Sequence, residues 1–307
     1  MHHRLSTLAV AAHVFVGASL GCARGDGRTA DSASARTAIA TARRDDFGDT
    51  LPATLVPRRI VSLNPATTEL FFALGAGDRL VGRTEYDLYP EEALAVPALG
   101  GGMRPNVEAI LGVRPDLVVL YASTENRDAA TRLRAAGVPT LSLRVDRIAQ
   151  FRGAVARLGE ILSDTATAHV VVDSVDRTLE RVRAATRGRP RAATFWKAWD
   201  SPVIAIGGGS FLTELVDIAG GRNIYGDDPR PSLDVTIEDV VRRDPDVVLA
   251  GPESAARMRA APAWQALRAV REGRVLVVDT VLVGRPGVRL GEAAASLARL
   301  LHPGAIQ

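Results

Sequence analysis

Two glutamates, Glu108 and Glu238, occupy matched places in this chain. Each is followed by an apolar stretch, a Pro-Asp pair and a strand-like run of Val and Leu. Two carboxylates can act as acid and base in glycoside hydrolysis, whereas separated surface carboxylates can bind arginines of a partner. An acid in the first turn of a helix also stabilises that helix through its dipole. Because the two glutamates belong to different repeats, we expect them on two lobes, which favours a contact role over catalysis.

Histidine and cysteine are too scarce for most catalytic or metal centres. Three of the five histidines lie in the N-terminal leader, which leaves His169 and His302 in the body. The one cysteine, Cys22, excludes an internal disulfide and a cysteine-based metal site. A hydrolase needs a nucleophile, a base and an orienting group, and no such set is recognisable. We therefore expect no enzyme activity, no metal site and no bound cofactor.

The composition is that of an ordinary folded protein. The chain has 307 residues, of which 47% are hydrophobic and 24% charged, with a formal net charge of +3. This length can bury a large core in one or two domains. Arginine is scattered and Lys197 is the only lysine, so the small basic excess predicts no nucleic-acid partner. The segment Gly207 to Ser210 lacks the Gly-Lys-Ser/Thr continuation of a phosphate-binding loop, which disfavours nucleotide binding.

Residues 1–22 have the pattern of an export signal. A short, positively charged start precedes an apolar stretch at 5–20, which is too short to span a bilayer but suits a signal-peptide core. The segment ends in Ala-Ser-Leu-Gly-Cys, which resembles a bacterial lipobox and predicts lipidation of Cys22. A plain secretory signal with a chance cysteine is the alternative. Residues 23–57 lack apolar periodicity and are interpreted as a flexible tether, so we expect a periplasmic or cell-surface, lipid-anchored protein.

The rest of the chain repeats an α/β unit. The first copy has a strand at 59–63 and, after a loop, a helix that begins Thr68-Glu69-Leu70 and stops at glycines. The second copy has a strand at 203–206, a loop, and a helix that begins Thr213-Glu214-Leu215. Glycine is the expected terminator of both helices. Two units in matching order predict two similar lobes.

A long helical segment joins the two lobes. Residues 146–188 contain no proline, and their apolar residues recur at helical spacing, with a break expected at Ser163-Asp164. The predicted fold class is α/β, with two similar Rossmann-like lobes at 58–145 and 189–307 joined by a long backbone helix. A ligand would lie in the cleft between the lobes, outside the carboxyl ends of the strands.

Further motifs stand at fixed places around these repeats: Arg59 to Pro65, Tyr86 to Pro90, Gly220 to Asn223, and Arg285 to Arg289. Together their order is similar to that in the helical-backbone (class III) substrate-binding proteins of ABC importers, specifically the vitamin B12-binding branch. The resemblance implies an ABC permease dimer with its ATPase subunits as partners. It also implies that Glu108 and Glu238 grip arginine pockets on the two permease subunits.

The ligand candidates come from the residues that match this family. Tyr86 is the first tyrosine of a Tyr-x-x-Tyr-Pro segment and is implied to pack on a corrin ring, although an aromatic there can simply be partly buried. One of Trp196 and Trp199 is expected to face the cleft, with Trp199 better placed. Arg285 can meet a polar group of the ligand or be a solvated surface charge. The loops at 64–67 and 207–210 can present backbone N–H groups or be tight turns. The predicted ligand-binding residues are Asn64, Tyr86, Met103, Trp199 and Arg285.

The class of ligand stays open between three metal chelates. A corrinoid best explains the segment from Tyr86 to Pro90, but the tryptophan that B12 binders carry before the first docking helix is replaced here by Gly101-Gly102-Met103-Arg104. A second expected aromatic is replaced around Pro231 to Leu233. Haem needs an axial tyrosine or histidine facing the cleft, and a ferric siderophore needs convergent arginines. The candidates for these two roles are Tyr86, Tyr89, Tyr121 and Tyr225, and Arg83, Arg104 and Arg285. A structural or adhesive lipoprotein, which would have no closed ligand cleft, is the other class of function.

Overall fold

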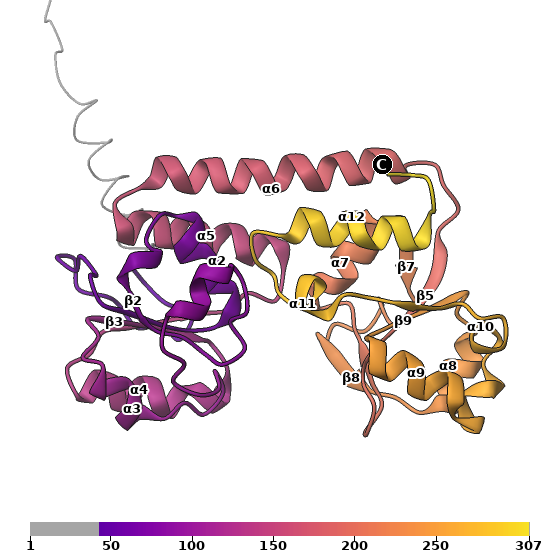
Figure 1. Ribbon diagram of the computed structural model, residues 1–307, viewed down its shortest axis with the longest axis horizontal. Coiled ribbons are helices and arrows are strands. Elements are labelled where there is room, and N and C mark those ends of the chain that lie inside the picture. The colour runs from indigo at the N-terminus through magenta and orange to yellow at the C-terminus, as the bar shows by residue number, and fades with distance from the viewer. Residues whose placement is uncertain (1–42, 307) are drawn as a thin grey trace, which may run out of the picture. The chain divides into compact units, whose positions relative to one another are not determined.

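The computed structural model describes residues 43–306, all of which belong to one compact unit, Ile39–Gln307. Two α/β lobes make up this unit (Figure 1). Residues 1–42, with the predicted signal segment, the predicted lipidation site Cys22 and the first part of the predicted tether at 23–57, lie outside the described residues. None of the described helices is both long and apolar enough to cross a membrane.

The N-terminal lobe is built on a four-stranded parallel sheet in the order β2-β1-β3-β4. Its strands are fully or nearly buried, as expected for a parallel sheet covered on both faces. The strands are β1 (Ile60–Leu63), β2 (Leu80–Gly82), β3 (Leu117–Tyr121) and β4 (Thr140–Leu143), and the helices are α2 (Pro65–Ala73), α3 (Val107–Gly112) and α4 (Arg127–Ala135).

The C-terminal lobe has a mixed six-stranded sheet in the order β10-β9-β5-β6-β8, with β7 paired to β5. Strands β7, β9 and β10 are parallel to their neighbours, whereas β6 and β8 are antiparallel. The strands are β5 (Ala192–Trp199), β6 (Ile204–Ile206), β7 (Gly221–Asn223), β8 (Ser232–Asp234), β9 (Val247–Ala250) and β10 (Val275–Val277). The helices are α7 (Phe211–Ile218), α8 (Ile237–Arg243), α9 (Pro252–Ala260), α10 (Arg268–Arg271), α11 (Thr280–Val283) and α12 (Leu290–Leu301).

Helices α5 (Ile148–Leu162) and α6 (Thr165–Thr186) connect the lobes. The break between them falls at Ser163-Asp164, where Ser163 has φ +60° and the Asp164 side chain accepts from the Thr167 N–H. Helix α6 has 22 residues, a length of about 33 Å, and packs against α5, α7 and α12 (Figure 1). One apolar core runs from the N-terminal sheet through these helices to the C-terminal lobe, so a continuous packed interior joins the lobes.

Residues 43–57 are not the free tether that the sequence suggested. Asp45 accepts from the Ser142 N–H at 3.0 Å, and the Asp46 N–H donates to the Ser142 carbonyl at 2.9 Å, so this segment pairs with the edge strand β4. Arg157 of α5 also donates to Asp46 at 2.7 Å. Leu51 is buried in the core. The segment therefore covers an otherwise open sheet edge.

Two local expectations were wrong. The expected loop at 64–67 is the first turn of α2, because the Asn64 side chain caps the helix and Pro65 suits its first position. The strand at 203–206 does not match the first strand of the N-terminal lobe, because β6 runs antiparallel to β5. The turn between β5 and β6 is only four residues long, and such a short turn can join only antiparallel strands.

Candidate functional site

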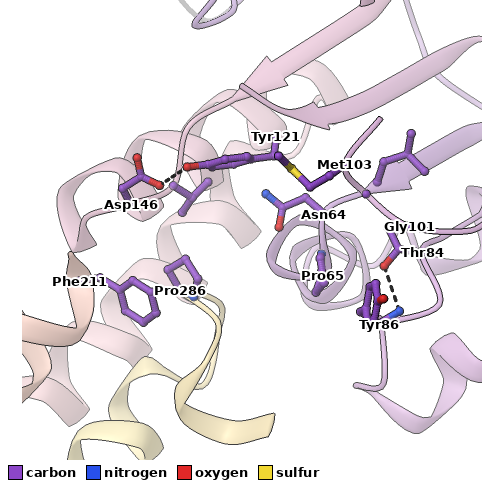
Figure 2. A pocket seen from close by; sticks show the side chains of 13 residues that line it. Asn64, Pro65, Thr84, Tyr86, Gly101, Met103, Tyr121, Asp146, Phe211 and Pro286 are labelled. Carbon is purple, nitrogen blue, oxygen red and sulfur yellow. Dashed lines mark hydrogen bonds between the residues drawn. The ribbon is translucent and has the colours of Figure 1, made fainter. Parts of the chain in front are cut away.

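A cavity of about 510 Å³ opens at the carboxyl ends of the N-terminal strands. Leu63 ends β1 and Tyr121 ends β3, while Asp146 follows β4; all three line the cavity. The C-terminal lobe contributes Phe211, the first residue of α7, and Pro286 (Figure 2). The cavity therefore lies where the two lobes meet, as the predicted fold requires.

The wall of this cavity is mostly apolar and nearly neutral. Among the described residues that line it, Asp146 is the only one with a charged side chain. Its volume is in the usual range for small-molecule sites, about 300–1,000 Å³. The remaining lining residues are Asn64, Pro65, Thr84, Tyr86, Gly101, Gly102, Met103 and Val145.

Tyr86 lines the cavity on a turn that is stabilised by hydrogen bonds to Thr84 and to the buried Asp87. The Tyr86 side chain is 59% exposed, and its N–H donates to Thr84 Oγ1 at 3.2 Å (Figure 2). The buried Asp87 accepts from the hydroxyls of Thr68 and Thr84. Burial raises the pKa of Asp87, while these hydrogen bonds and Arg83 act to lower it. The turn thus presents the Tyr86 ring from a fixed backbone.

Asn64 and Met103, two of the residues predicted to bind the ligand, also line the cavity. The Asn64 side-chain oxygen accepts from the Ala66 N–H at 3.0 Å, which leaves its amide nitrogen as the free end of the group. Met103 is half exposed, and its sulfur lies 3.8 Å from Ser123 Oγ. Figure 2 shows both residues among the side chains that line the cavity.

Arg285 is not among the residues that line the cavity. Its guanidinium donates to the carbonyls of Val281 and Tyr86, so it holds the turn that carries Tyr86. Burial lowers the pKa of Arg285 more than Glu69 and Asp87 raise it. Here the structure gives Arg285 a supporting position behind the cavity wall.

The two tryptophans of β5 behave differently. Trp196 is buried in the core and Trp199 is 62% exposed at the end of the strand, where it pairs with Ile204. Trp199 is not among the lining residues of the 510 Å³ cavity. Beside it, the buried Lys197 donates to Asp200 and to Ser254 Oγ, which fixes this end of β5.

The glycine loop at 207–210 does not offer free N–H groups on its three glycines, which agrees with the tight-turn alternative. The N–H groups of Gly207, Gly208 and Gly209 donate to the carbonyls of Pro231, Asp228 and Arg230. A Cβ on any of these glycines would lie 2.2 Å from a backbone carbonyl oxygen. Glycine is required here because two stretches of backbone approach closely.

Sequence reasoning missed the strongest polar pair of the cavity. The Tyr121 hydroxyl donates to Asp146 Oδ1 at 2.6 Å (Figure 2). Burial, this hydrogen bond and the Asp146 charge together raise the pKa of Tyr121. Tyr121 had been weighed only as a haem ligand, and Asp146 only as the start of a helix. Their places at the ends of adjacent strands were the available signal.

The two matched glutamates are both exposed. Glu108 lies in the first turn of α3 and is 3.3 Å from Arg132, and Glu238 lies in the first turn of α8. Their helices are capped alike, by the side chains of Asn106 and Thr236. Backbone hydrogen bonding and the Thr236 hydroxyl lower the pKa of Glu238.

Most of the tyrosines and arginines considered as haem or siderophore ligands make other contacts within the protein. Tyr225 is buried in the C-terminal core and donates to Asp239, and Tyr89 lies under the guanidinium of Arg289. The buried Arg83 donates to the carbonyls of Ala93 and Thr84. Within residues 43–306 no group of three or more His, Cys, Asp or Glu side chains could hold a metal ion.

Two α/β lobes, a helical connection and a cleft between them define a helical-backbone (class III) substrate-binding protein. The chain belongs to the periplasmic binding protein family, whose model matches residues 60–282. This is a family of solute-binding proteins that serve ABC transporters, not a family of enzymes.

Three relatives illustrate its range. The Bacillus subtilis (strain 168) protein YvrC, an uncharacterised ABC transporter substrate-binding lipoprotein, is 29% identical over 255 residues, covering 80% of this chain and 81% of YvrC. The crystal structure of the periplasmic vitamin B12-binding protein BtuF of Vibrio cholerae has a TM-score of 0.71 and 25% identity, covering 80% of this chain and 97% of BtuF. The haem-binding protein BhuT, in complex with two haems, also has a TM-score of 0.71 and 25% identity, covering 79% of this chain and 97% of BhuT.

Proposed function

We propose that this substrate-binding protein captures a corrinoid, of the vitamin B12 type, and delivers it to an ABC permease. The observation that carries the proposal is the nearly neutral, mostly apolar wall of the cavity, with Tyr86 and Met103 offering apolar surface to a flat ring. A corrin ring is broad and apolar, and most of its peripheral groups are neutral amides. The likeness to BtuF supports the same ligand class.

Haem is the second candidate, because Tyr121 lies in the cavity and BhuT is similar. Two features count against it. Haem carries two carboxylates, which prefer cationic partners, and no cationic side chain is found among the described lining residues. The Tyr121 hydroxyl donates to Asp146, and its raised pKa opposes the phenolate form that would ligate iron. The lack of a cationic side chain among the described lining residues also counts against an anionic ferric siderophore.

Calorimetric titration of residues 39–307 with cyanocobalamin, and in parallel with hemin, tests the ligand. We expect saturable binding of cyanocobalamin, and a weaker or absent response to hemin. Two substitutions, Tyr86→Ala and Met103→Ala, should each weaken cyanocobalamin binding by about tenfold, through loss of apolar contact. No heat with cyanocobalamin, together with a shifted Soret band with hemin, would exclude the corrinoid and leave the transport role in place.

We further propose that Glu108 and Glu238 contact the two subunits of the permease. Both carboxylates are exposed near the starts of equivalent helices, one on each lobe. Separated carboxylates can register a binding protein on a two-fold symmetric partner. Reversing both charges, Glu108→Arg with Glu238→Arg, should abolish uptake and leave the affinity for the ligand unchanged.

A matched control for this test exists in the same lobes. Asp128 and Glu253 are also exposed acids in the first turns of helices, α4 and α9. The double variant Asp128→Arg with Glu253→Arg makes the same change in net charge and should retain uptake. If both double variants lose uptake alike, general electrostatic repulsion rather than specific contact explains the loss.

Lipid attachment at Cys22 is part of the same proposal. The lipobox-like sequence supports it, as does the similarity to the lipoprotein YvrC. Metabolic labelling with a palmitate analogue should mark the wild-type protein and leave Cys22→Ser unmarked. Labelling of both proteins, or of neither, would argue for a plain secretory signal.

A further inference from the structure

Asp146 has an unusual place in the cavity. It follows β4 and comes just before α5, so it lies where the N-terminal lobe leads into the connecting helices. Its N–H donates to Gln150 Oε1 at 2.8 Å, and its carbonyl accepts from the N–H of Phe211 at 2.6 Å, the first residue of α7. The backbone of Asp146 is therefore held by the connecting helix α5 and by the C-terminal lobe, and its carboxylate faces the Tyr121 hydroxyl from a fixed position (Figure 2).

The two carboxylate oxygens of Asp146 have different partners. Oδ1 accepts from the Tyr121 hydroxyl at 2.6 Å. Oδ2 is 3.9 Å from Nε of Arg144, whose guanidinium instead donates to the Ala122 carbonyl at 3.1 Å. No described residue donates a hydrogen bond to Oδ2, so this oxygen retains acceptor capacity beside the Arg144 guanidinium.

The polar end of the cavity is thus rich in acceptors. An ionised aspartate only accepts hydrogen bonds, and Tyr121 uses its one hydroxyl proton on Asp146. The Asn64 side-chain oxygen accepts from the Ala66 N–H, so the Asn64 amide NH2 group adds donors to the cavity lining. A primary amide of a ligand can donate to the Asp146 carboxylate and accept from the Asn64 amide nitrogen. A carboxylate has only acceptors and a negative charge, so it would be repelled.

We infer that Asp146, oriented by Tyr121, determines specificity in this cleft: it selects ligands that present a neutral primary amide and rejects those that present a carboxylate at the same place. The inference rests on the proposed corrinoid function and adds which part of the ligand is recognised. Asp146 contacts the ligand, and Tyr121 is a positioning residue that holds the carboxylate. A carboxylate pushed against Asp146 would meet a negative charge, and no cationic side chain among the described lining residues would compensate it, which costs more than a lost amide contact.

The test compares cyanocobalamin with its monocarboxylate derivatives, in which one peripheral amide is hydrolysed. The wild-type protein should bind the amide form at least about tenfold more tightly than the derivative that is hydrolysed at the recognised position. Asp146→Asn should remove most of this discrimination, because an asparagine can donate to the carboxylate. Tyr121→Phe should reduce the discrimination partially. Asp176→Asn changes a carboxylate that does not line this cavity, so it should leave the discrimination unchanged.

The readout is the ratio of the two affinities within one protein preparation, so a partly folded variant changes the number of sites and not the ratio. A ratio that survives in Asp146→Asn overturns the inference while the corrinoid function stands. A wild-type protein that binds no cyanocobalamin overturns the corrinoid function, and the inference with it. Equal binding of amide and carboxylate forms by the wild type overturns the inference alone.

Discussion

Two glutamates at equivalent points of the repeats, Glu69 and Glu214, join the lobes in the same way. In the first contact, Glu69 of α2 accepts from Arg289 at 3.3 Å, at the start of α12, and the backbone of Val288 also acts to lower the pKa of this carboxyl. We call these three residues the Glu69 latch. Each repeat therefore sends one carboxylate to the start of a helix that follows the last strand of the other lobe.

The second contact, the Glu214 latch, has the same parts. Glu214 of α7 accepts from the Ile148 N–H at 2.8 Å and from Arg147 Nε at 3.1 Å, at the start of α5. In both latches the arginine is the N-cap residue of its helix. The two latches thus follow the internal repeat of the chain, and a carboxylate at a helix N-terminus is favoured in each.

Burial separates the two latches. In the Glu69 latch the side chains of Glu69 and Arg289 are 2% and 14% exposed, whereas those of Glu214 and Arg147 are 25% and 40% exposed. Arg289 also lies 3.8 Å over the ring of Tyr89, on the segment that carries Tyr86. The same sequence motif therefore makes a buried pair in one place and a partly solvated pair in the other. Breaking the buried pair should cost more, because a charge loses its partner away from water.

The largest effect is expected from Glu69→Ala. The change leaves Arg289 buried with only the Val281 carbonyl and the Tyr89 ring as partners. The free energy of unfolding should fall by about 3 kcal/mol, measured by urea denaturation. The control is Asp176→Asn, which removes the negative charge from an exposed ion pair with Arg152. This variant should cost under about 1 kcal/mol. Equal losses in the two variants would refute the importance of burial.

Gly287→Ala should have the next largest effect. A Cβ at this position would lie 2.3 Å from Glu69 Oε2, and Glu69 cannot move aside without losing Arg289. Overpacking of this kind costs about 2 kcal/mol. The matched control is Gly153→Ala in α5, where the added Cβ meets nothing within 4 Å and should be stabilising by about 0.5 kcal/mol. Thermal or urea unfolding of both variants measures the difference.

The sequence predicted the repeat, the fold class and the break in the connecting helices, because these depend on local periodicity and capping. It also predicted Asn64, Tyr86 and Met103 as candidates, and these do line the cavity. The latches were not predicted. Glu69 and Arg289 are 220 residues apart, and no local pattern reveals which surface a carboxylate will meet. The burial that separates Glu69 from Glu214 arises only when the lobes pack.

Arg285 and Asp146 also show that the sequence does not reveal which way a side chain points. Arg285 stands in a family motif and was expected at the ligand, but its guanidinium reaches back to the Tyr86 carbonyl. Asp146 belongs to no motif, yet it lines the cavity. In both cases the direction of one side chain decides the role, and that direction depends on residues distant in the chain.

The dependence of stability on pH gives a smaller effect that sharpens the comparison. Burial raises the pKa of Glu69 more than Arg289, Arg285 and Val288 lower it. The folded chain then holds this proton more tightly than the unfolded chain, so the contribution of Glu69 is fully present below its ordinary pKa of 4.5 and is lost as the pH rises through the folded-state pKa. The destabilisation caused by Glu69→Gln should accordingly be larger near pH 4 than near pH 7. Urea denaturation at both pH values measures it, and the opposite trend would mean that the pair with Arg289 dominates over burial.

The smallest effect is expected from Glu214→Ala. Water can solvate the exposed side of Arg147 once its partner is gone, and Arg147 retains its hydrogen bond of 2.6 Å to the Gly208 carbonyl. The loss is then that of the solvated ion pair with Arg147 together with one hydrogen bond from the Ile148 N–H at the start of α5, about 1 kcal/mol in all. Moderate salt should reduce this cost further, whereas the cost of Glu69→Ala should hardly change, because screening acts on solvated pairs and much less on buried ones. Denaturation of both variants at low and high salt therefore separates the two latches, and a salt-independent cost at Glu214 would show that the hydrogen bond, and not the charge of Arg147, makes this contact.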